Sequence, residues 1–234
     1  MISDNIQNIE NKIMAACDRA GRNRDDITLI AVSKTKPVEI IKEVYNNNIY
    51  TFGENKVQEL RDKYEDIKGE GLDKLKWHMI GHLQRNKVKY IVDKVDLIHS
   101  VDSLRLAKQI DKEAKKRDIN MDVLIQVNIG DDPKKFGFKP EETEEAIVKI
   151  SKLEGINIKG LMTMPPYVTN PEENRDYFKK MHQLFVDIDS KNIDNVTMET
   201  LSMGMTGDYE VAIEEGATMV RIGTGIFGER NYNK

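Results

Sequence analysis

The chain has 234 residues, of which 32% are charged and 39% hydrophobic, and its formal net charge is −4. This length suits one α/β barrel or two small domains. No apolar run approaches the roughly 20 residues that a membrane span needs, and the first residues resemble no signal peptide. The negative charge argues against a dedicated nucleic-acid-binding protein. We expect a cytoplasmic protein that binds neither membranes nor nucleic acid.

The counts of cysteine and histidine restrict the metal and redox chemistry. A single cysteine, Cys17, excludes an internal disulfide framework and a multi-cysteine zinc site, which fits a reducing cytoplasm. Of the four histidines, His78 and His82 would lie roughly 13 Å apart if one strand continued between them. We therefore expect no metal site. The densest basic run, residues 85–89, lacks interleaved aromatic side chains and is interpreted as a solvated helix face.

Helical and strand patterns alternate along the chain. The first pattern is a helix over residues 3–20, which Gly21 ends. The predicted strands then cover residues 27–33, 49–53, 76–81, 97–101, 121–128, 156–162, 197–202 and 217–222. The predicted helices between them cover residues 38–47, a segment from 57, 85–91, 104–114, 141–151, 171–188 and 207–214, with a last turn within 223–228.

Eight strand–helix units in about 210 residues predict a closed (β/α)8 TIM barrel. The barrel forms a single α/β domain over residues 1–234, preceded by an extra N-terminal helix, because no linker or change in composition divides the chain. An open doubly wound sheet is the alternative.

Lys34 follows the first predicted strand at a strand-to-helix turn. In parallel α/β folds, ligands bind at this edge of the sheet, although a solvated turn lysine would have the same sequence. Lys34 continues the alternation of Ile30 and Val32, which predicts that it faces the barrel interior. Lys36 precedes Pro37, and we expect it to lead away toward solvent.

Barrel closure would bring polar and glycine residues from several strand ends together. The segments at the ends of strands seven, eight, one, two and three are 201–205, 221–225, 33–35, 53–55 and 78–82. The loops after strands seven and eight are the usual phosphate site of this fold. Ser202 and Thr224 could donate hydroxyl groups there, and glycines let backbone N–H groups approach an anion. The glycines could instead serve only the turns.

A lysine beside a phosphate site suggests a phosphorylated aldehyde held as an imine, because lysine amines form imines with carbonyl compounds. Arg221, on the predicted last strand, keeps its proton and could donate only to an acceptor such as an unprotonated ring nitrogen. An ion pair between Arg221 and a carboxylate is the alternative.

Five motifs resemble those of the pyridoxal phosphate homeostasis protein family, a single-domain relative of the alanine racemase barrel. The motifs are Ala-Val-Ser-Lys-Thr-Lys-Pro (31–37), Phe-Gly-Glu-Asn-Lys-Val-Gln-Glu (52–59), Trp-His-Met-Ile-Gly-His-Leu-Gln-Arg-Asn-Lys (77–87), Leu-Ser-Met-Gly-Met (201–205) and Val-Arg-Ile-Gly-Thr-Gly-Ile-Phe-Gly (220–228). Together they cover essentially the whole chain.

The resemblance implies a specific cofactor site. Lys34 would carry pyridoxal 5′-phosphate (PLP) as an internal aldimine, and Arg221 would face the pyridine nitrogen. The residues implied around the phosphate are Ser202, Gly204, Gly223 and Thr224, and Met205 is implied as a further cofactor-binding residue. Asn55 and His82 match the family's pocket motifs. One departure is Phe136, where the family usually has a small residue, and we expect it to leave the cofactor site undisturbed.

The implied function is intracellular PLP homeostasis, in which the protein holds, buffers or delivers the cofactor without robust turnover. A PLP-dependent amino-acid racemase is the alternative, and a Schiff-base aldolase without a cofactor is a third reading. Racemases of the related fold need a second domain that supplies a tyrosine base, and we expect none here. The resemblance also implies a monomer whose partners, besides PLP, are PLP-dependent apoenzymes.

Overall fold

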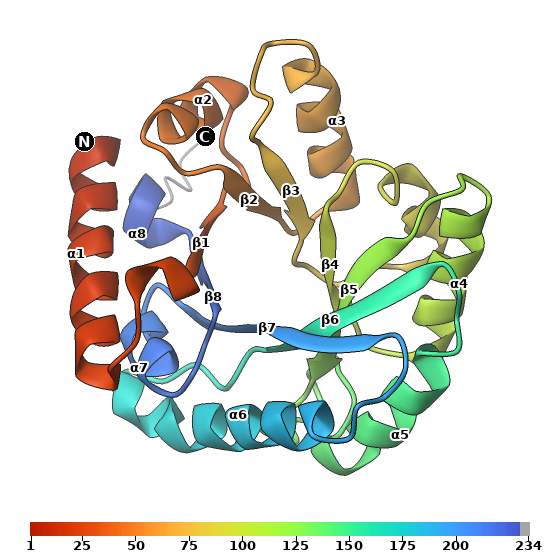
Figure 1. Ribbon diagram of the computed structural model, residues 1–234. Coiled ribbons are helices and arrows are strands. Elements are labelled where there is room, and N and C mark those ends of the chain that lie inside the picture. Colours follow the sequence, from red (N-terminus) through yellow and green to blue (C-terminus); the bar gives the residue numbers. More distant parts are fainter. Residues whose placement is uncertain (230–234) are drawn as a thin grey trace.

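A computed structural model describes residues 1–229. Eight parallel strands pair in chain order, and the last pairs with the first, so the sheet closes into a barrel (Figure 1). The predicted TIM barrel is therefore confirmed, and the open sheet is excluded. The strands are β1 (Thr28–Val32), β2 (Thr51–Glu54), β3 (Lys76–Met79), β4 (Leu97–Val101), β5 (Met121–Val127), β6 (Ile156–Thr163), β7 (Val196–Met205) and β8 (Met219–Ile222).

Helices surround the strands on the outside of the barrel (Figure 1). The α-helices are α1 (Ile2–Ala20), α2 (Val38–Asn46), α3 (Val57–Ile67), α4 (Leu104–Lys115), α5 (Pro140–Ile150), α6 (Arg175–Asp189), α7 (Tyr209–Glu214) and α8 (Thr224–Phe227). Three 3-10 helices, η1 (Arg24–Asp26), η2 (Arg85–Tyr90) and η3 (Pro171–Asn174), complete the set. Within residues 1–229, none of the helices has both the length and the apolar character of a membrane span.

The extra helix α1 packs against α7 and α8, beside the place where the barrel closes (Figure 1). Its buried side chains Ile6, Ile9, Ile13 and Ala16 recur with the period of an α-helix and form one apolar face. Gly21 ends the helix with φ +65°, a left-handed conformation that glycine adopts readily. The sequence prediction for this helix is confirmed.

Two separate apolar clusters stabilise the barrel. The larger cluster lies between the strands and the surrounding helices and includes Leu29 and Ala31 of β1. Ile30, which alternates with them, belongs to a second cluster. Since successive side chains of a strand point to opposite faces, this second cluster fills the barrel interior. Its members are Ile30, Leu97, Leu124, Met162 and Met219.

Strand β7 is longer than its sequence predicts. It continues through Met205, whereas the apolar pattern predicts an end at Ser202. The pairing of β7 with β8 shifts between Ser202 and Met205, and Gly204 in this stretch has φ +90°. Polar and glycine residues that resemble a loop in the sequence therefore continue the strand through an irregularity. Ser202 consequently lies inside the barrel wall and not in the loop above it.

The pairing of β6 with β7 depends on a glycine, which provides a stability test. Gly160 has φ +143°, and a Cβ atom there would lie 1.8 Å from the carbonyl oxygen of Thr200. Because the opposing atom belongs to the backbone, Gly160→Ala should lower the free energy of unfolding by about 3 kcal/mol or more. Gly207→Ala is the control, since a Cβ at Gly207 meets no atom within 4 Å. Urea unfolding that gives equal stabilities for the two variants would contradict this account.

Candidate cofactor site at the carboxyl mouth of the barrel

Lys34 lies at the carboxyl mouth of the barrel, in the turn that follows β1. Ile30 of the same strand pairs with Arg221 of β8, so the two strands are adjacent at this end of the barrel. Val32 and Lys34 line a small hollow together with Gly223 and Thr224, which follow β8. The predicted approach of the Lys34 turn to the end of strand eight is therefore present in the structure.

Lys36 differs from its sequence prediction. It lines the same hollow as Lys34 and is only partly exposed. Its ammonium group donates to the carbonyl oxygen of Phe227 at 3.3 Å and lies 5.7 Å from the centre of the Phe227 ring. The expectation that Lys36 leads away into solvent is thus wrong, because α8 folds back over the β1 turn and offers an acceptor.

The backbone after Lys34 is strained. Thr35 has φ +65°, a left-handed conformation that is unfavourable for a β-branched residue. The Thr35 N–H donates to the Glu59 carboxylate of α3, and the Lys36 N–H donates to the Ser33 carbonyl at 3.0 Å. Such strain persists only where surrounding contacts determine the conformation.

A buried ion pair fixes the residue before Lys34. Lys63 of α3 donates to the carboxylates of Glu54 and Glu59, each at 2.7 Å, and to the Ser33 carbonyl at 2.8 Å. The Ser33 hydroxyl donates to Glu54 at 2.7 Å. Burial raises the pKa of Glu54, and the Lys63 ammonium opposes this shift. Ser33 and Thr35, which flank Lys34, are therefore both anchored to this cluster.

A chain of buried hydrogen bonds crosses the barrel interior below the mouth. One nitrogen of the Arg221 guanidinium donates to the Ser202 hydroxyl at 2.5 Å, and another donates to the Thr163 carbonyl at 2.9 Å. The Ser202 oxygen also lies 3.0 Å from Nδ1 of His99. Nε2 of His99 lies 3.0 Å from Nδ1 of His78. Residues from strands β3, β4, β6, β7 and β8 thus form one connected polar layer.

Burial determines the protonation state of the two histidines in this hydrogen-bonded layer. It lowers the pKa of His78 to about 3 and the pKa of His99 well below its ordinary value, so both imidazoles are neutral at physiological pH. Ser202 accepts from Arg221 and can donate its own proton to Nδ1 of His99. Nε2 of His99 then donates to Nδ1 of His78. This assignment uses every polar hydrogen between Arg221 and His78.

Arg221 carries the positive charge of the layer. Burial lowers its pKa to about 10, which leaves the guanidinium protonated at neutral pH. Within residues 1–229 it forms no ion pair with a carboxylate, in contrast to the alternative that the sequence left open. Two of its five N–H groups have the partners described above, so donors remain for a ligand.

The residues predicted around a phosphate group have different surroundings in the structure. A Cβ at Gly223 would have no atom closer than 3.6 Å, so the backbone there is open to a close approach. At Gly204, by contrast, a Cβ would lie 2.6 Å from Ala212, and the Met205 N–H already donates to Asp208. The backbone at Gly223 and the adjacent exposed Thr224 is therefore accessible, whereas Gly204 lies against α7 and the Met205 N–H is already bonded.

Asn55 and His82 lie on the loops after β2 and β3. The Oδ1 atom of Asn55 is buried and has no hydrogen-bond partner within residues 1–229. His82 lines different hollows from Lys34: its Nδ1 lies 3.0 Å from Asp102, and its ring stacks on Phe136 with centroids 3.7 Å apart. Phe136 therefore contacts His82, a predicted pocket residue, and neither of the two lines the Lys34 hollow.

Comparisons with known proteins agree with this geometry. The profile of the alanine racemase N-terminal domain matches residues 5–231. The pyridoxal phosphate homeostasis protein of Aquifex aeolicus is 48% identical over 229 residues, which cover 98% of each chain. This chain belongs to the pyridoxal phosphate homeostasis protein family.

Solved structures extend the comparison. PipY from Synechococcus elongatus PCC7942, solved with PLP bound, is 31% identical with a TM-score of 0.84, and the match covers 97% of this chain and all of PipY. An alanine racemase from Clostridium difficile is 20% identical with a TM-score of 0.71, and the match covers 98% of this chain but only 61% of the racemase. The racemase therefore shares the barrel fold.

Several residues near the site were not predicted from the sequence. His99, Glu54 and Lys63 form the buried contacts described above, yet none of them was singled out. His99 and His78 come from adjacent strands, and their contact depends on the pairing of β3 with β4. A signal was present for Glu54, because a carboxylate directly after an apolar strand requires a partner.

The buried Glu54–Lys63 pair gives a prediction with a defined pH dependence. Lys63→Met should lower the free energy of unfolding by about 3 kcal/mol near neutral pH, because it leaves Glu54 charged and unpaired. The pKa of Glu54 in the folded state, already raised by burial, then rises further. The folded variant therefore binds a proton at higher pH than the unfolded chain, and its stability deficit should shrink as the pH falls and Glu54 becomes protonated.

The matched control is Lys68→Met. Lys68 is exposed, caps the carboxyl end of the same helix and forms no ion pair within residues 1–229. Its stability should stay within about 0.5 kcal/mol of the unmutated protein. Chemical unfolding at several pH values measures both variants. A Lys63→Met deficit that is independent of pH would show that Glu54 is not the group left uncompensated.

Proposed function

We propose that this protein binds PLP through Lys34 at the carboxyl mouth and holds it for intracellular PLP homeostasis. The observation that carries the proposal is the position of Lys34 in one hollow with Gly223 and Thr224. The names of the curated relatives and the PLP in PipY support it. When bound, the cofactor supplies an aldehyde that condenses with a lysine amine, a phosphate group and a pyridine nitrogen.

The residues at the mouth fit these three groups. Lys34 provides the amine, and the open backbone at Gly223 with the Thr224 hydroxyl suits the phosphate. Arg221, in the polar layer below the mouth, has N–H groups without a partner in residues 1–229, and these could donate to an unprotonated ring nitrogen at the floor of the mouth. The unpartnered Oδ1 atom of Asn55 marks a polar group that a ligand could satisfy.

Ser202 has an indirect role in this proposal. Its hydroxyl is fully buried between Arg221 and His99, which supports a role in positioning the guanidinium rather than the predicted contact with the phosphate. Thr206, which accepts a bond from the Gly225 N–H at 3.4 Å, ties the loop after β7 to the turn after β8. Both residues would act on the cofactor through their neighbours.

Holding the cofactor is favoured over racemase catalysis. An arginine donor at the pyridine nitrogen keeps this nitrogen unprotonated, which weakens the ring as an electron sink. The match covers 98% of the Aquifex homeostasis protein but only 61% of the Clostridium difficile racemase, whose chain continues beyond the shared barrel. The reading as an aldolase without a cofactor has no support among these relatives.

The two lysines of the β1 turn provide the direct test. We expect Lys34→Ala to lose the visible absorbance of the bound cofactor while retaining its far-UV circular dichroism spectrum. Lys36→Ala, the matched control, should retain the absorbance, because the Lys36 ammonium is engaged by the Phe227 carbonyl. Borohydride reduction followed by peptide mapping should place the pyridoxyl group on Lys34. A pyridoxyl group on Lys36 in the unmutated protein would refute the assignment.

A second test concerns catalysis. Purified protein loaded with PLP should show no robust racemase, transaminase or decarboxylase activity with common amino acids. The reason is that its ring nitrogen partner is a permanently protonated arginine at physiological pH. Chiral chromatography and coupled assays measure the rates. A turnover number near the enzyme median of roughly 10 per second would overturn the non-catalytic part of the proposal.

A further inference from the structure

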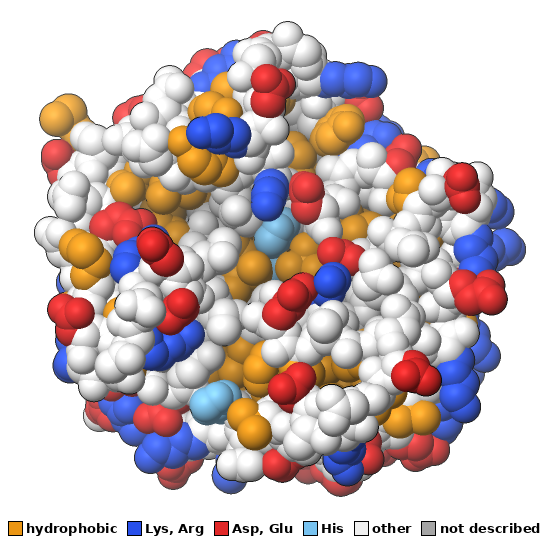
Figure 2. Space-filling model, in the orientation of Figure 1, with side chains coloured by type: hydrophobic (Ala, Val, Ile, Leu, Met, Phe, Trp, Pro, Cys, Tyr) orange, Lys and Arg blue, Asp and Glu red, His pale blue; other side chains and the backbone are white. Residues whose placement is uncertain are grey.

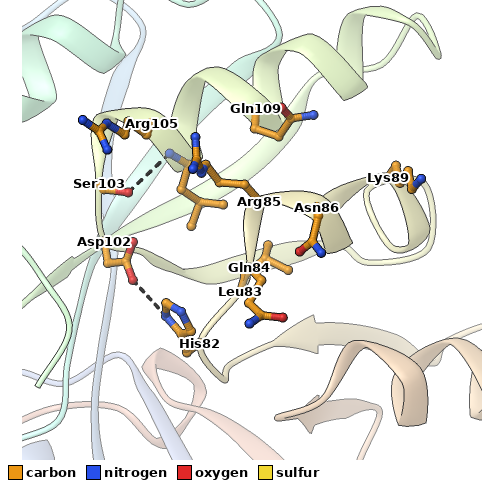
Figure 3. A pocket seen from close by; sticks show the side chains of 11 residues that line it. His82, Leu83, Gln84, Arg85, Asn86, Lys89, Asp102, Ser103, Arg105 and Gln109 are labelled. Carbon is orange, nitrogen blue, oxygen red and sulfur yellow. Dashed lines mark hydrogen bonds and ion pairs between the residues drawn. The ribbon is translucent and has the colours of Figure 1, made fainter.

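A cleft of about 830 Å³ lies beside the mouth, between η2 and the beginning of α4 (Figure 3). Three cationic side chains line it: Arg85 and Lys89 of η2 and Arg105 of α4. In the close-up, Arg85 extends from η2 toward the first turn of α4 (Figure 3). This cleft is distinct from the Lys34 hollow, whose lining residues it does not share.

The charges in the cleft are not compensated. Within residues 1–229, Arg85, Lys89 and Arg105 form no ion pair with a carboxylate. The one carboxylate in the lining, Asp102, is held by His82 at 3.0 Å. Three cations and one carboxylate leave an excess of two positive charges when His82 is neutral. This concentration contrasts with the negative net charge of the whole chain.

Further cationic side chains lie on the surface next to the cleft. His82 also lines an adjoining hollow of about 370 Å³, whose cations include Lys56, Lys87 and Arg61, the last of which is paired with Asp62 at 2.9 Å. Lys87 and Lys89 lie near the ring of Tyr90, with ammonium-to-centroid distances of 5.8 and 4.9 Å. On the face of the barrel drawn in Figure 2, basic and acidic side chains are interspersed. The cationic cleft is thus a local feature.

The shape and chemistry of the cleft suit a small ligand. Its volume lies within the range of small-molecule sites, roughly 300–1,000 Å³. The amides of Gln84 and Gln109 provide donors and acceptors, whereas the side chains of Leu83 and Leu106 beneath them are almost fully buried. Arginine side chains on two facing elements favour an anion with several oxygen atoms, because a guanidinium binds phosphate through paired N–H groups.

We propose that the cleft between η2 and α4 binds a small organic polyanion with at least two phosphate groups, of the class of a nucleoside diphosphate. Arg85 and Arg105 bind the phosphates from opposite walls, and the amides of Gln84 and Gln109 are available to the rest of the ligand. A nucleic-acid strand is a poorer fit, because it needs free aromatic rings on which bases can stack. The aromatic ring in the cleft lining, His82, is already stacked on Phe136, and the Tyr90 ring lines the adjoining hollow.

Titration calorimetry of the full chain at low ionic strength tests the proposal with ADP and pyrophosphate as probes. Both should bind with submillimolar Kd, and AMP and inorganic phosphate should bind at least about ten-fold more weakly. Arg85→Gln and Arg105→Gln should each raise the Kd of ADP by about 10- to 100-fold, as expected for lost bonds to a charged group. Their side chains are exposed, so folding should be unaffected.

Two controls locate the site. Lys108→Gln removes an exposed cation of α4 that lies outside the cleft lining and should change the Kd less than about two-fold. Lys34→Ala should leave ADP binding unchanged, which separates this cleft from the proposed cofactor site. Amide resonances of Leu106 and Gln109 should shift on ADP addition.

Three results with ADP would overturn the proposal. These are an absence of saturable ADP binding, an equal loss of affinity in Lys108→Gln, and a loss of affinity in Lys34→Ala. A single-stranded RNA oligonucleotide that binds more tightly than ADP and resists displacement by it would also overturn the proposal, and would identify the cleft as part of a nucleic-acid surface.

Discussion

The hydrogen bond between Arg221 and the Ser202 hydroxyl is the contact on which the polar interior of this barrel depends. A guanidinium that is 4% exposed and has no carboxylate within ion-pair distance in residues 1–229 needs other acceptors. Ser202 and the Thr163 carbonyl provide them. Ser202 can accept from Arg221 because its own proton has an acceptor in His99, and His99 in turn has His78. A change at any of these positions leaves a buried polar atom without a partner.

The polar layer divides the barrel interior into an apolar lower part and a polar part near the carboxyl mouth. The apolar cluster that includes Ile30 and Met219 fills the interior below, and the polar chain lies toward the mouth. Met219 and Arg221 point to the same side of β8, two residues apart, so one strand supplies both levels. The floor of the mouth is therefore rigid, since its side chains are held by the hydrogen bonds described above and not by solvent.

The alternation of apolar and helical segments was sufficient to predict the barrel, and the position of Lys34 after the first strand followed from it. The extent of β7 was not predictable in the same way, because Met203 and Gly204 resemble a loop until the shifted pairing with β8 is known. The contact of His99 with Ser202 joins residues 103 positions apart, and no spacing rule reaches across that separation. The engagement of Lys36 likewise depends on where α8 folds.

The charge on the floor of the mouth is independent of pH over the physiological range. His78 titrates at about 3, His99 lies well below its ordinary range, and Arg221 titrates at about 10. Between these values the layer carries one positive charge and gains or loses no proton. If the protein holds PLP as proposed, the donor presented to its ring nitrogen is therefore constant, and a pH dependence of retention must arise above the floor, at the lysine amine or the phosphate. A binding protein that must retain its ligand under varying conditions benefits from such a floor, whereas a catalyst that protonates the ring nitrogen during turnover needs a partner that can exchange its proton.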